Sequence, residues 1–555
     1  MDGREMNHRA SYPSQNSVFK PSQDWTSGMD DKGESQNAWL PKTVRALNDS
    51  ETARGHPRTL ILALDGTGDQ FDNDNSNIVN FVSCLKKHSP AEQVTYYQSG
   101  IGTYDKGGLT NGIGAAMDMA VGSGLGTHIK DAYKFLMSSY REGDKICLFG
   151  FSRGAYTVRC LAGMLHKVGL LPASNGSQVN FAYDFYKDDS ESGKKLAEGF
   201  KRTFCTHVEV YYVGVFDCVA SVGFIPRKLP FSKSPTNSIR HFRHAMALDE
   251  HRAKFKVCQW QQQNPGDDSH LKRRETVDLT PSGRFRRRFG LKKTPAFATN
   301  GTATAKPGAE SNGNLSDDLE AKFVSQEKAH HRNRYFETDV LEVWFRGCHA
   351  DIGGGAVANE CRHMLSRIPL RWMIRQCFEC DTGILFDTAR LAEYGLDVHT
   401  LWPTYGKPSK PVAGPPPALV EKYQKKILAP LHRRSVFLPI GSEDDRIKDA
   451  PSAEALNYIL PSEGNEDYFD TLEGCNDMLK IAKFWWVLEI WPVKIRVLAK
   501  DGEGWEKRVR MNLGRYRGVR ENEPKMHWTV RHAIDEHNYK LRTRTDKSTS
   551  WSVIV

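Results

Sequence analysis

The sequence predicts an α/β fold with a mostly parallel β-sheet and helices on both of its faces. Short apolar segments of the strand type alternate with amphipathic segments of about ten to fifteen residues, which is typical of α/β domains with parallel sheets. Several apolar segments, beginning with residues 60–64, are continuous runs, as expected of strands buried on both faces. The chain of 555 residues can bury one large core or two ordinary ones.

The predicted elements follow one another from residue 57. The first strand, 60–64, precedes a helix whose N-cap is Asn75 or Ser76, because a side-chain oxygen there can accept a hydrogen bond from the first turn. Later segments are a strand at 93–100, a glycine-rich loop at 100–126, a helix at 128–140, a strand at 144–151, a helix from 152 to about 168, strands at 206–217 and 340–351, and helical stretches beyond Gly355.

Composition divides the chain into three parts. Residues 1–56 are rich in Ser, Asn, Asp and Gly without a sustained period, and predict a disordered tail. Residues 57–372 form the predicted α/β domain, interrupted at about 261–334 by a basic insert that lacks apolar periodicity. Residues 373–555 predict a mainly helical C-terminal or cap region.

Charge and cysteine content narrow the class of protein. The net charge of +10 comes mostly from residues 271–293, so it indicates a basic loop rather than a basic protein and favours no nucleic-acid partner. Residues 1–20 lack the apolar segment of a secretory signal, and eleven scattered cysteines are typical of a reduced, cytoplasmic protein. Cys377 and Cys380 form an isolated C-x-x-C pair, a weak signal for zinc, so we expect no metal and no cofactor.

A glycine-flanked serine, Ser152, lies between a predicted strand and a predicted helix in KICLFGFSRGAYTVRCLAGML. The pattern G-x-S-x-G places residues without bulk two positions before and after the serine, as a nucleophile on a sharp strand-to-helix turn requires. The N–H groups at the start of the helix then face the developing oxyanion. This context favours a nucleophile over an ordinary turn serine.

A serine nucleophile needs a base and an acid that orients the base. Asp217 and His349 each end a predicted strand, at the edge of the sheet where such folds bind ligands, and they follow Ser152 in the order seen in α/β-hydrolases. Asp351 is the alternative acid. His244, in RHAMALDEHR, is the alternative base, although its helical pattern indicates packing or substrate contact.

The predicted oxyanion hole combines the backbone N–H of Arg153 with one from the loop after the first strand, at Gly66 or Thr67. The same loop, DGTGDQFDNDNSN, has partial likeness to two other sites. A phosphatase of the haloacid dehalogenase type needs a second Asp where Thr67 stands. A calcium loop needs Gly and Glu where Asn77 and Ser83 stand. Both departures argue against a metal in this loop.

Residues 478–498, MLKIAKFWWVLEIWPVKIRVL, carry four aromatic residues among Leu, Ile and Val, with lysines and an arginine around them. Pro492 ends the predicted helix, which is too short to span a membrane. A helix rich in Trp and Lys can lie in a lipid interface, and the basic insert can attract anionic lipid, so both are candidate peripheral membrane contacts. We expect instead that this face packs on the core as a lid or cap.

Six motifs in fixed order carry a resemblance to one family: LALDGTGDQF, SGIGTY, GFSRGAYTVR, GVFDCVASVG, RHAMALDEHR and VWFRGCHADIGGG. They resemble the uncharacterised α/β-hydrolase family related to the type VI secretion phospholipase effectors, which has a Tle-type catalytic domain. The resemblance runs from about Arg58 to about Trp372. It implies an α/β-hydrolase fold with a Ser-Asp-His triad, Ser152 as the nucleophile, and a lipid substrate. The added tail, insert and C-terminal region are similar to a fungal elaboration.

Together these patterns predict a serine hydrolase that cleaves carboxylic esters, of phospholipids or other lipids, in the cytoplasm or at the periphery of membranes. Two alternatives stay open. One is a non-catalytic membrane-associated or scaffold protein that retains the fold, for which His349 would lie far from Ser152. The other is a metal-dependent phosphoester hydrolase that uses the Asp-rich loop.

Overall fold

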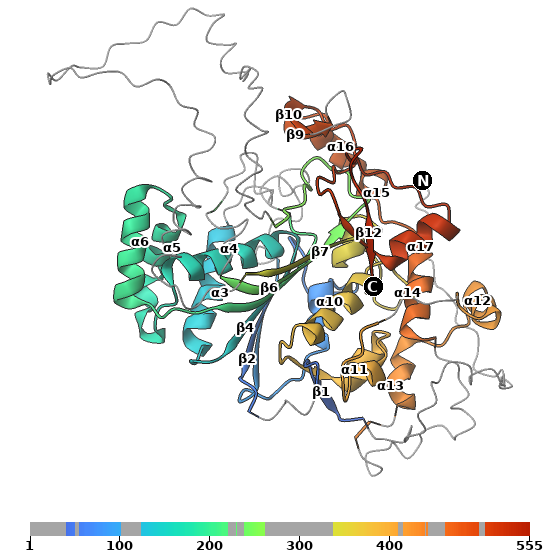
Figure 1. Ribbon diagram of the computed structural model, residues 1–555, viewed down its shortest axis with the longest axis horizontal. Helices are drawn as coiled ribbons and strands as arrows, with labels where there is room; N and C mark the ends of the chain where they lie inside the picture. The colour runs from blue at the N-terminus through green and yellow to red at the C-terminus, as the bar shows by residue number, and fades with distance from the viewer. Residues whose placement is uncertain are drawn as a thin grey trace, which may run out of the picture.

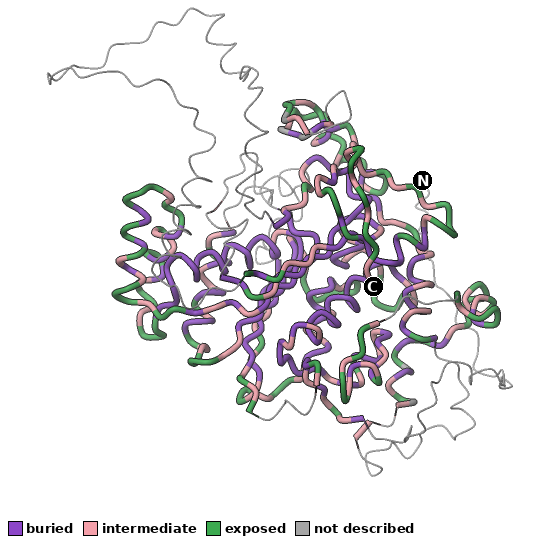
Figure 2. The backbone as a smooth tube through the Cα atoms, viewed as in Figure 1, coloured by how far each residue is buried: buried purple, intermediate pink, exposed green. Residues whose placement is uncertain are grey.

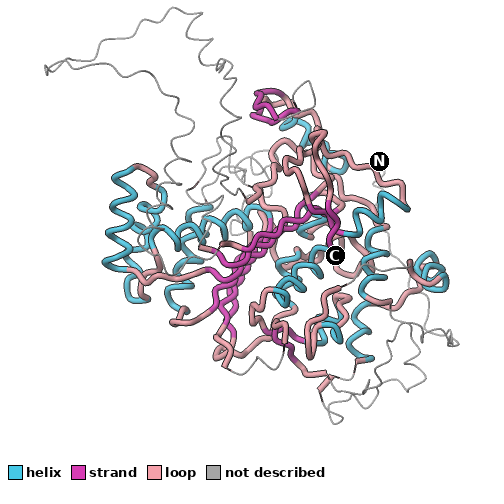
Figure 3. The backbone as a smooth tube through the Cα atoms, viewed as in Figure 1, coloured by secondary structure: helices cyan, strands magenta, loops and turns pink. Residues whose placement is uncertain are grey.

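The computed structural model describes residues 40–49, 55–100, 124–219, 229, 238–260, 337–408, 414–438, 440–441, 461–498 and 505–555. The basic insert, most of the glycine-rich loop and residues 1–39 therefore lie outside the described residues. An eight-stranded sheet of strand order β12-β11-β7-β6-β5-β4-β2-β3 crosses the middle of the molecule (Figure 1, Figure 3). Its strands all run parallel, and they are β2 (Thr59–Leu64), β3 (Gln93–Gln98), β4 (Lys145–Phe151), β5 (Val210–Phe216), β6 (Ile239–Ala247), β7 (Asp339–Phe345), β11 (Lys525–His527) and β12 (Ser552–Ile554).

Helices cover both faces of the sheet, which confirms the predicted α/β-hydrolase-like architecture (Figure 1). One face packs on α3 (Leu125–Ser139), α4 (Ser152–Val168), α5 (Val179–Lys187) and α6 (Glu191–Phe204). The other face packs on α1 (Asn77–Ser83), α10 (Arg367–Glu379) and α11 (Thr388–Glu393). All six residues of β2 are buried between these layers, which explains its unbroken apolar run (Figure 2).

The register of the sheet brings three loops to one edge. Phe151 at the end of β4 pairs with Phe216 at the end of β5, which in turn pairs with Ala245 of β6. Phe345 at the end of β7 pairs with Ala247. The residues that follow these strands therefore meet at the carboxyl edge of the sheet, where open α/β sheets bind their ligands.

Two predicted segments take a different structure. Part of the predicted tail, residues 40–49, belongs to the fold: β1 (Thr43–Arg45) pairs with β8 (Leu385–Asp387), and Val44 is buried. The segment predicted as helical around His244 is strand β6, because β5 and β7 pair with it on both sides. Apolar spacing in that short stretch fits either structure, and only the sheet neighbours decide it.

The C-terminal region is helical only in part, since it also supplies β11 and β12 to the main sheet and forms the hairpin β9 (Val493–Leu498) and β10 (Trp505–Arg510). Its other helices include α12 (Pro417–Gln424), α13 (Arg434–Phe437), α14 (Glu463–Thr471) and α17 (Trp528–Glu536). Within the described ranges, no helix is long and apolar enough to cross a membrane.

Residues 478–498 do not form the single packed helix that the sequence predicts. They form two short helices, α15 (Met478–Ile481) and α16 (Trp486–Glu489), a 3₁₀ turn at Lys483–Trp485, and then β9. Phe484 and Trp491 are more than half exposed, at 52% and 57%, so the expectation that this face packs on the core is wrong for these side chains.

Candidate active site

Ser152 occupies the turn between β4 and α4, with a φ of +56°. A non-glycine residue rarely adopts this left-handed conformation, and it is typical of a nucleophile on a strand-to-helix turn. The flanking glycines are required by close packing. A Cβ on Gly154 would collide with the carbonyl oxygens of Leu64 and Asp65, and one on Gly150 would lie 2.6 Å from the Cα of Ala155.

The structure brings Ser152, His349 and Asp217 into one hydrogen-bonded chain. The Nε2 atom of His349 lies 2.8 Å from the Ser152 Oγ, and its Nδ1 lies 2.6 Å from an Asp217 carboxylate oxygen. All three side chains are buried, with Asp217 fully so. Each residue follows a different strand, β4, β5 or β7, as the sheet register requires. The geometry matches that of a nucleophile, a base and an orienting acid.

The Asp217 carboxylate also binds a guanidinium that the sequence analysis missed. Arg517 donates from Nη1 to one Asp217 oxygen at 2.6 Å and from Nη2 to the other at 2.8 Å. The backbone N–H of Ala247 donates to Asp217 at 3.0 Å. The pKa of Asp217 lies well below its usual value because the Arg517 charge and the hydrogen bonds outweigh the cost of burial. No local motif identifies Arg517, which lies 300 positions along the chain from its partner.

The imidazole of His349 lies between two aromatic rings. The ring centroids of Phe151 and Phe255 are each 4.8 Å from that of His349. Burial lowers the pKa of His349, and the hydrogen bond to Asp217 opposes that shift. The base is therefore held neutral, as a proton acceptor must be.

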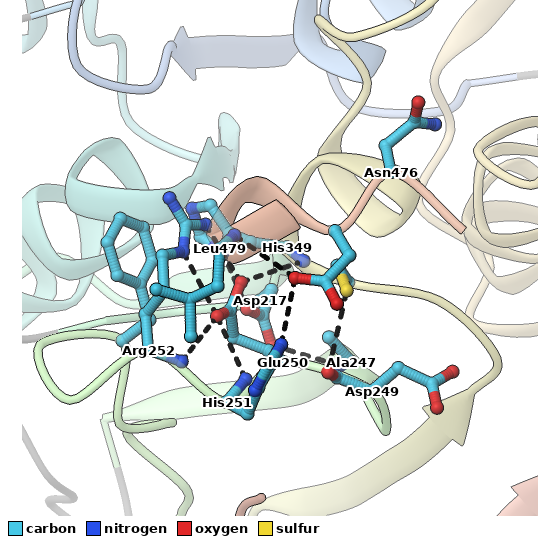
Figure 4. A network of polar contacts seen from close by, with 12 residues as sticks. Asp217, Ala247, Asp249, Glu250, His251, Arg252, His349, Asn476 and Leu479 are labelled. Atoms are coloured by element: carbon cyan, nitrogen blue, oxygen red, sulfur yellow. Dashed lines mark hydrogen bonds and ion pairs between the residues drawn. The ribbon is translucent and has the colours of Figure 1, made fainter. Parts of the chain in front are cut away.

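Glu250 and Arg252 form a second buried pair beside His349 (Figure 4). The Glu250 carboxylate accepts a hydrogen bond from the His349 backbone N–H at 3.2 Å, and it pairs with the Arg252 guanidinium at 2.8 Å. The pKa of Glu250 is lowered to about 2, since Arg252 outweighs the cost of burying the charge. This pair fixes the backbone from which the base projects. The sequence motif RHAMALDEHR contains both residues but does not indicate this role.

The three predicted oxyanion-hole residues lie in two segments, at the start of α4 and in the loop after β2. Arg153 is the first residue after Ser152 at the start of α4. The Thr67 hydroxyl is buried and has no hydrogen-bond partner among the described residues. Gly66 differs, because its backbone N–H donates to the Asp65 carboxylate at 2.8 Å, so in this conformation it is not available to an oxyanion.

The alternative acid and base are engaged elsewhere. His244 accepts from the Cys218 backbone N–H at 3.1 Å through Nε2 and contacts the Glu342 carboxylate at 2.8 Å through Nδ1. Asp351 accepts from the backbone N–H groups of Cys348 and Asn476, and burial raises its pKa to about 6. Neither residue belongs to the chain of hydrogen bonds at Ser152.

Hydrogen bonds hold the start of the Asp-rich loop in place. Asp65 accepts from the Ser76 hydroxyl at 2.8 Å and the Tyr97 hydroxyl at 2.9 Å, and Ser76 is the N-cap of α1. In the described part of the chain, the groups that could hold a metal lie elsewhere, at His241, Asp339 and Cys380 and at His532, Glu536 and His537. Neither of these two groups contains Cys377.

The family model for the catalytic domain of Tle1-like phospholipase effectors of type VI secretion systems matches residues 58–376. The chain belongs to this family. Membership supports a lipase or phospholipase hydrolase role. The uncharacterized protein YEL023C of Saccharomyces cerevisiae is 26% identical over 565 residues, covering 88% of this chain and 80% of that protein.

Two solved structures show distant similarity. One is an uncharacterized protein from Pseudomonas aeruginosa, with 14% identity and a TM-score of 0.29 over 78% of this chain and 64% of the other. The second is the Tle1 effector bound to the VgrG spike of the type VI secretion system. It has 18% identity and a TM-score of 0.22, over 43% of this chain and 53% of the effector chain.

Proposed function

We propose that the protein is a serine hydrolase that cleaves carboxylic esters of lipids, as a phospholipase or an acyl-esterase. The observation that carries the proposal is the continuous chain from Ser152 through His349 to Asp217, with both distances under 3 Å. Family membership favours a lipid ester as the substrate. The alternative of a non-catalytic scaffold requires the imidazole to lie far from the serine, and a distance of 2.8 Å gives it no support.

In the proposed reaction the Ser152 Oγ attacks the ester carbonyl carbon while its proton passes to His349 Nε2. The tetrahedral intermediate places its negative oxygen toward the N–H of Arg153 and the Thr67 side of the first loop. Collapse expels the alcohol, which takes the proton from His349, and leaves an acyl-serine. A water molecule, deprotonated by His349, then releases the carboxylic acid and restores Ser152. Asp217 stays ionised throughout and stabilises the imidazolium.

Labelling with a fluorophosphonate probe tests this proposal, because the probe reacts only with an activated serine. The wild-type protein should be labelled and should hydrolyse lipid or short-chain esters. Ser152→Ala should lose both by a factor of about 10³ or more, with an unchanged thermal unfolding temperature. Equal labelling of the variant would place the reactive group at another residue. A folded wild-type protein that neither reacts nor hydrolyses any ester would favour the scaffold alternative.

We further propose that the protein works in the reducing cytoplasm, in contact with membranes. All eleven cysteines are free thiols in the structure, a pattern usual in that compartment.

A further inference from the structure

Exposed apolar side chains are concentrated in two neighbouring segments of the C-terminal region. Of the sixteen large hydrophobic residues exposed in the described ranges, nine lie between positions 481 and 513. We call this set the apolar platform: Ile481, Phe484, Trp486, Val487, Ile490, Trp491, Val509, Met511 and Leu513. The other seven are scattered along the chain. A concentration of this kind indicates an interaction surface, whereas single exposed residues are ordinary.

Backbone contacts join the two halves of the platform. The N–H groups of Asn512 and Leu513 both donate to the Glu489 carbonyl oxygen, and the buried Glu489 carboxylate accepts from the Gly514 N–H at 2.9 Å. A Cβ on Gly514 would lie 3.3 Å from the Trp486 ring. The helices α15 and α16 and the hairpin β9–β10 accordingly form one projection at an end of the molecule (Figure 1).

Aromatic contacts connect the platform to the candidate active site. The ring of Trp485 lies edge-on to Phe255, with centroids 5.4 Å apart, and Phe255 contacts His349 at 4.8 Å. The Arg252 guanidinium lies over both aromatic rings, 3.5 Å from the Phe255 centroid and 4.8 Å from that of Trp485. A molecule seated on the platform therefore lies beside the residues that hold the base.

Cations flank the platform. Lys480 and Lys483 are exposed within it, Lys480 also reaching Asp477 at 3.4 Å. Lys254 and Lys256 lie on either side of Phe255, and the pKa of Lys256 is lowered to about 8 by burial and by the neighbouring charges of Lys254 and Arg544. Positive groups around exposed Trp, Phe and Ile are the pattern of a surface that lies in an anionic lipid interface.

We propose that the apolar platform docks the protein on the surface of an anionic phospholipid bilayer. The apolar side chains enter the interface while the flanking cations contact phosphate-bearing headgroups. The proposal deepens the proposed function, because docking brings ester substrates next to Ser152. A protein partner is the less favoured occupant, since the exposed aromatic and aliphatic side chains are bordered by the exposed cations Lys480 and Lys483, which suit anionic headgroups.

The test is co-sedimentation of the full chain with vesicles, in the Ser152→Ala background so that no lipid is consumed. We compare vesicles of phosphatidylcholine alone with equal parts of phosphatidylcholine and phosphatidylserine. Phe484→Ser with Ile490→Ser removes two exposed platform side chains. Phe181→Ser with Leu196→Ser, each 56% exposed on α5 and α6, is the matched control. Because all four side chains are exposed, every variant should unfold at the wild-type temperature.

We expect binding to the phosphatidylserine vesicles that weakens by about tenfold or more in the platform variant and not in the control. Equal binding by the platform variant, or equal loss in the control, would overturn the proposal. A dimer in size-exclusion chromatography that only the platform variant loses would assign the surface to a second copy of the chain. The two proposals fail in different assays. If the serine-hydrolase proposal is wrong, the wild-type protein is not labelled by the fluorophosphonate. If only the docking proposal is wrong, labelling is normal and the vesicle binding alone differs from the expectation.

Discussion

At the residue scale, the unusual feature of the site is the guanidinium on the triad acid. Arg517 binds both oxygens of Asp217, one of which also accepts from His349. The Asp217 carboxylate therefore interacts with two groups at once, the permanent cation of Arg517 and the imidazole of His349. The sequence indicates Ser152, Asp217 and His349 through strand ends and chain order, but a long-range ion pair such as this one leaves no pattern in the residues around it.

Replacing Arg517 should change the pH dependence of hydrolysis. The pKa of His349 is already below its usual value through burial, so activity should persist on the acid side of pH 6.5. In Arg517→Met the cation beside Asp217 is lost, so the Asp217 carboxylate stabilises the His349 imidazolium more strongly and the His349 pKa rises. The acid limb of the pH profile of kcat/KM should then move up by about one pH unit. Arg517→Lys keeps the cation and should stay closer to the wild type. If both variants lost activity equally and the acid limb of the pH profile did not move, Arg517 would have a structural role only.

At the element scale, the sequence predicts β2, β4, β5 and β7, because buried parallel strands read as continuous apolar runs. It also predicts α1 and α4, the helices that follow β2 and β4. It mispredicts β6 and misses β11 and β12. The last two have three residues each, too few to carry a period, and their place is set by pairing with β7 and with each other. The packing of residues 478–498 is mispredicted because their composition shows that the segment is apolar but does not show which of its side chains the fold buries.

The close packing of α4 against β2 lets us predict the effect of a substitution at Gly154. In Gly154→Ala the new Cβ meets backbone carbonyl oxygens of Leu64 and Asp65, which cannot move aside as a side chain can. We expect destabilisation of about 1–3 kcal/mol and a large loss of labelling at Ser152, because α4 must shift. Gly199→Ala, in α6 with nothing near the new Cβ, should instead stabilise by about 0.5–1 kcal/mol. Urea unfolding measures both values. If Gly154→Ala unfolded with the same free energy as the wild-type protein, the packing argument would be contradicted.

At the scale of the whole molecule, the boundary predicted near residue 372 does not separate two bodies. Helix α10 runs through it and pairs with α14 by buried ion pairs, Arg371 with Asp467 at 2.6 Å and Arg375 with Glu463 at 2.6 Å. Arg517, from beyond the region that the family model matches, binds the triad acid. The described C-terminal region is thus part of the catalytic core as well as the source of the platform.

A chain that ends at residue 376 should therefore fail to fold, although it contains Ser152, Asp217 and His349. Truncation strips partners from the buried guanidinium groups of Arg371 and Arg375, and breaking such a buried pair costs about 3–5 kcal/mol. Two such losses are comparable with the total stability of about 5–15 kcal/mol of an ordinary domain. A chain of residues 40–555 retains the described contacts and is the control. Solubility, circular dichroism and thermal unfolding compare the two, and a soluble 40–376 chain with a cooperative transition would show that the catalytic domain stands alone.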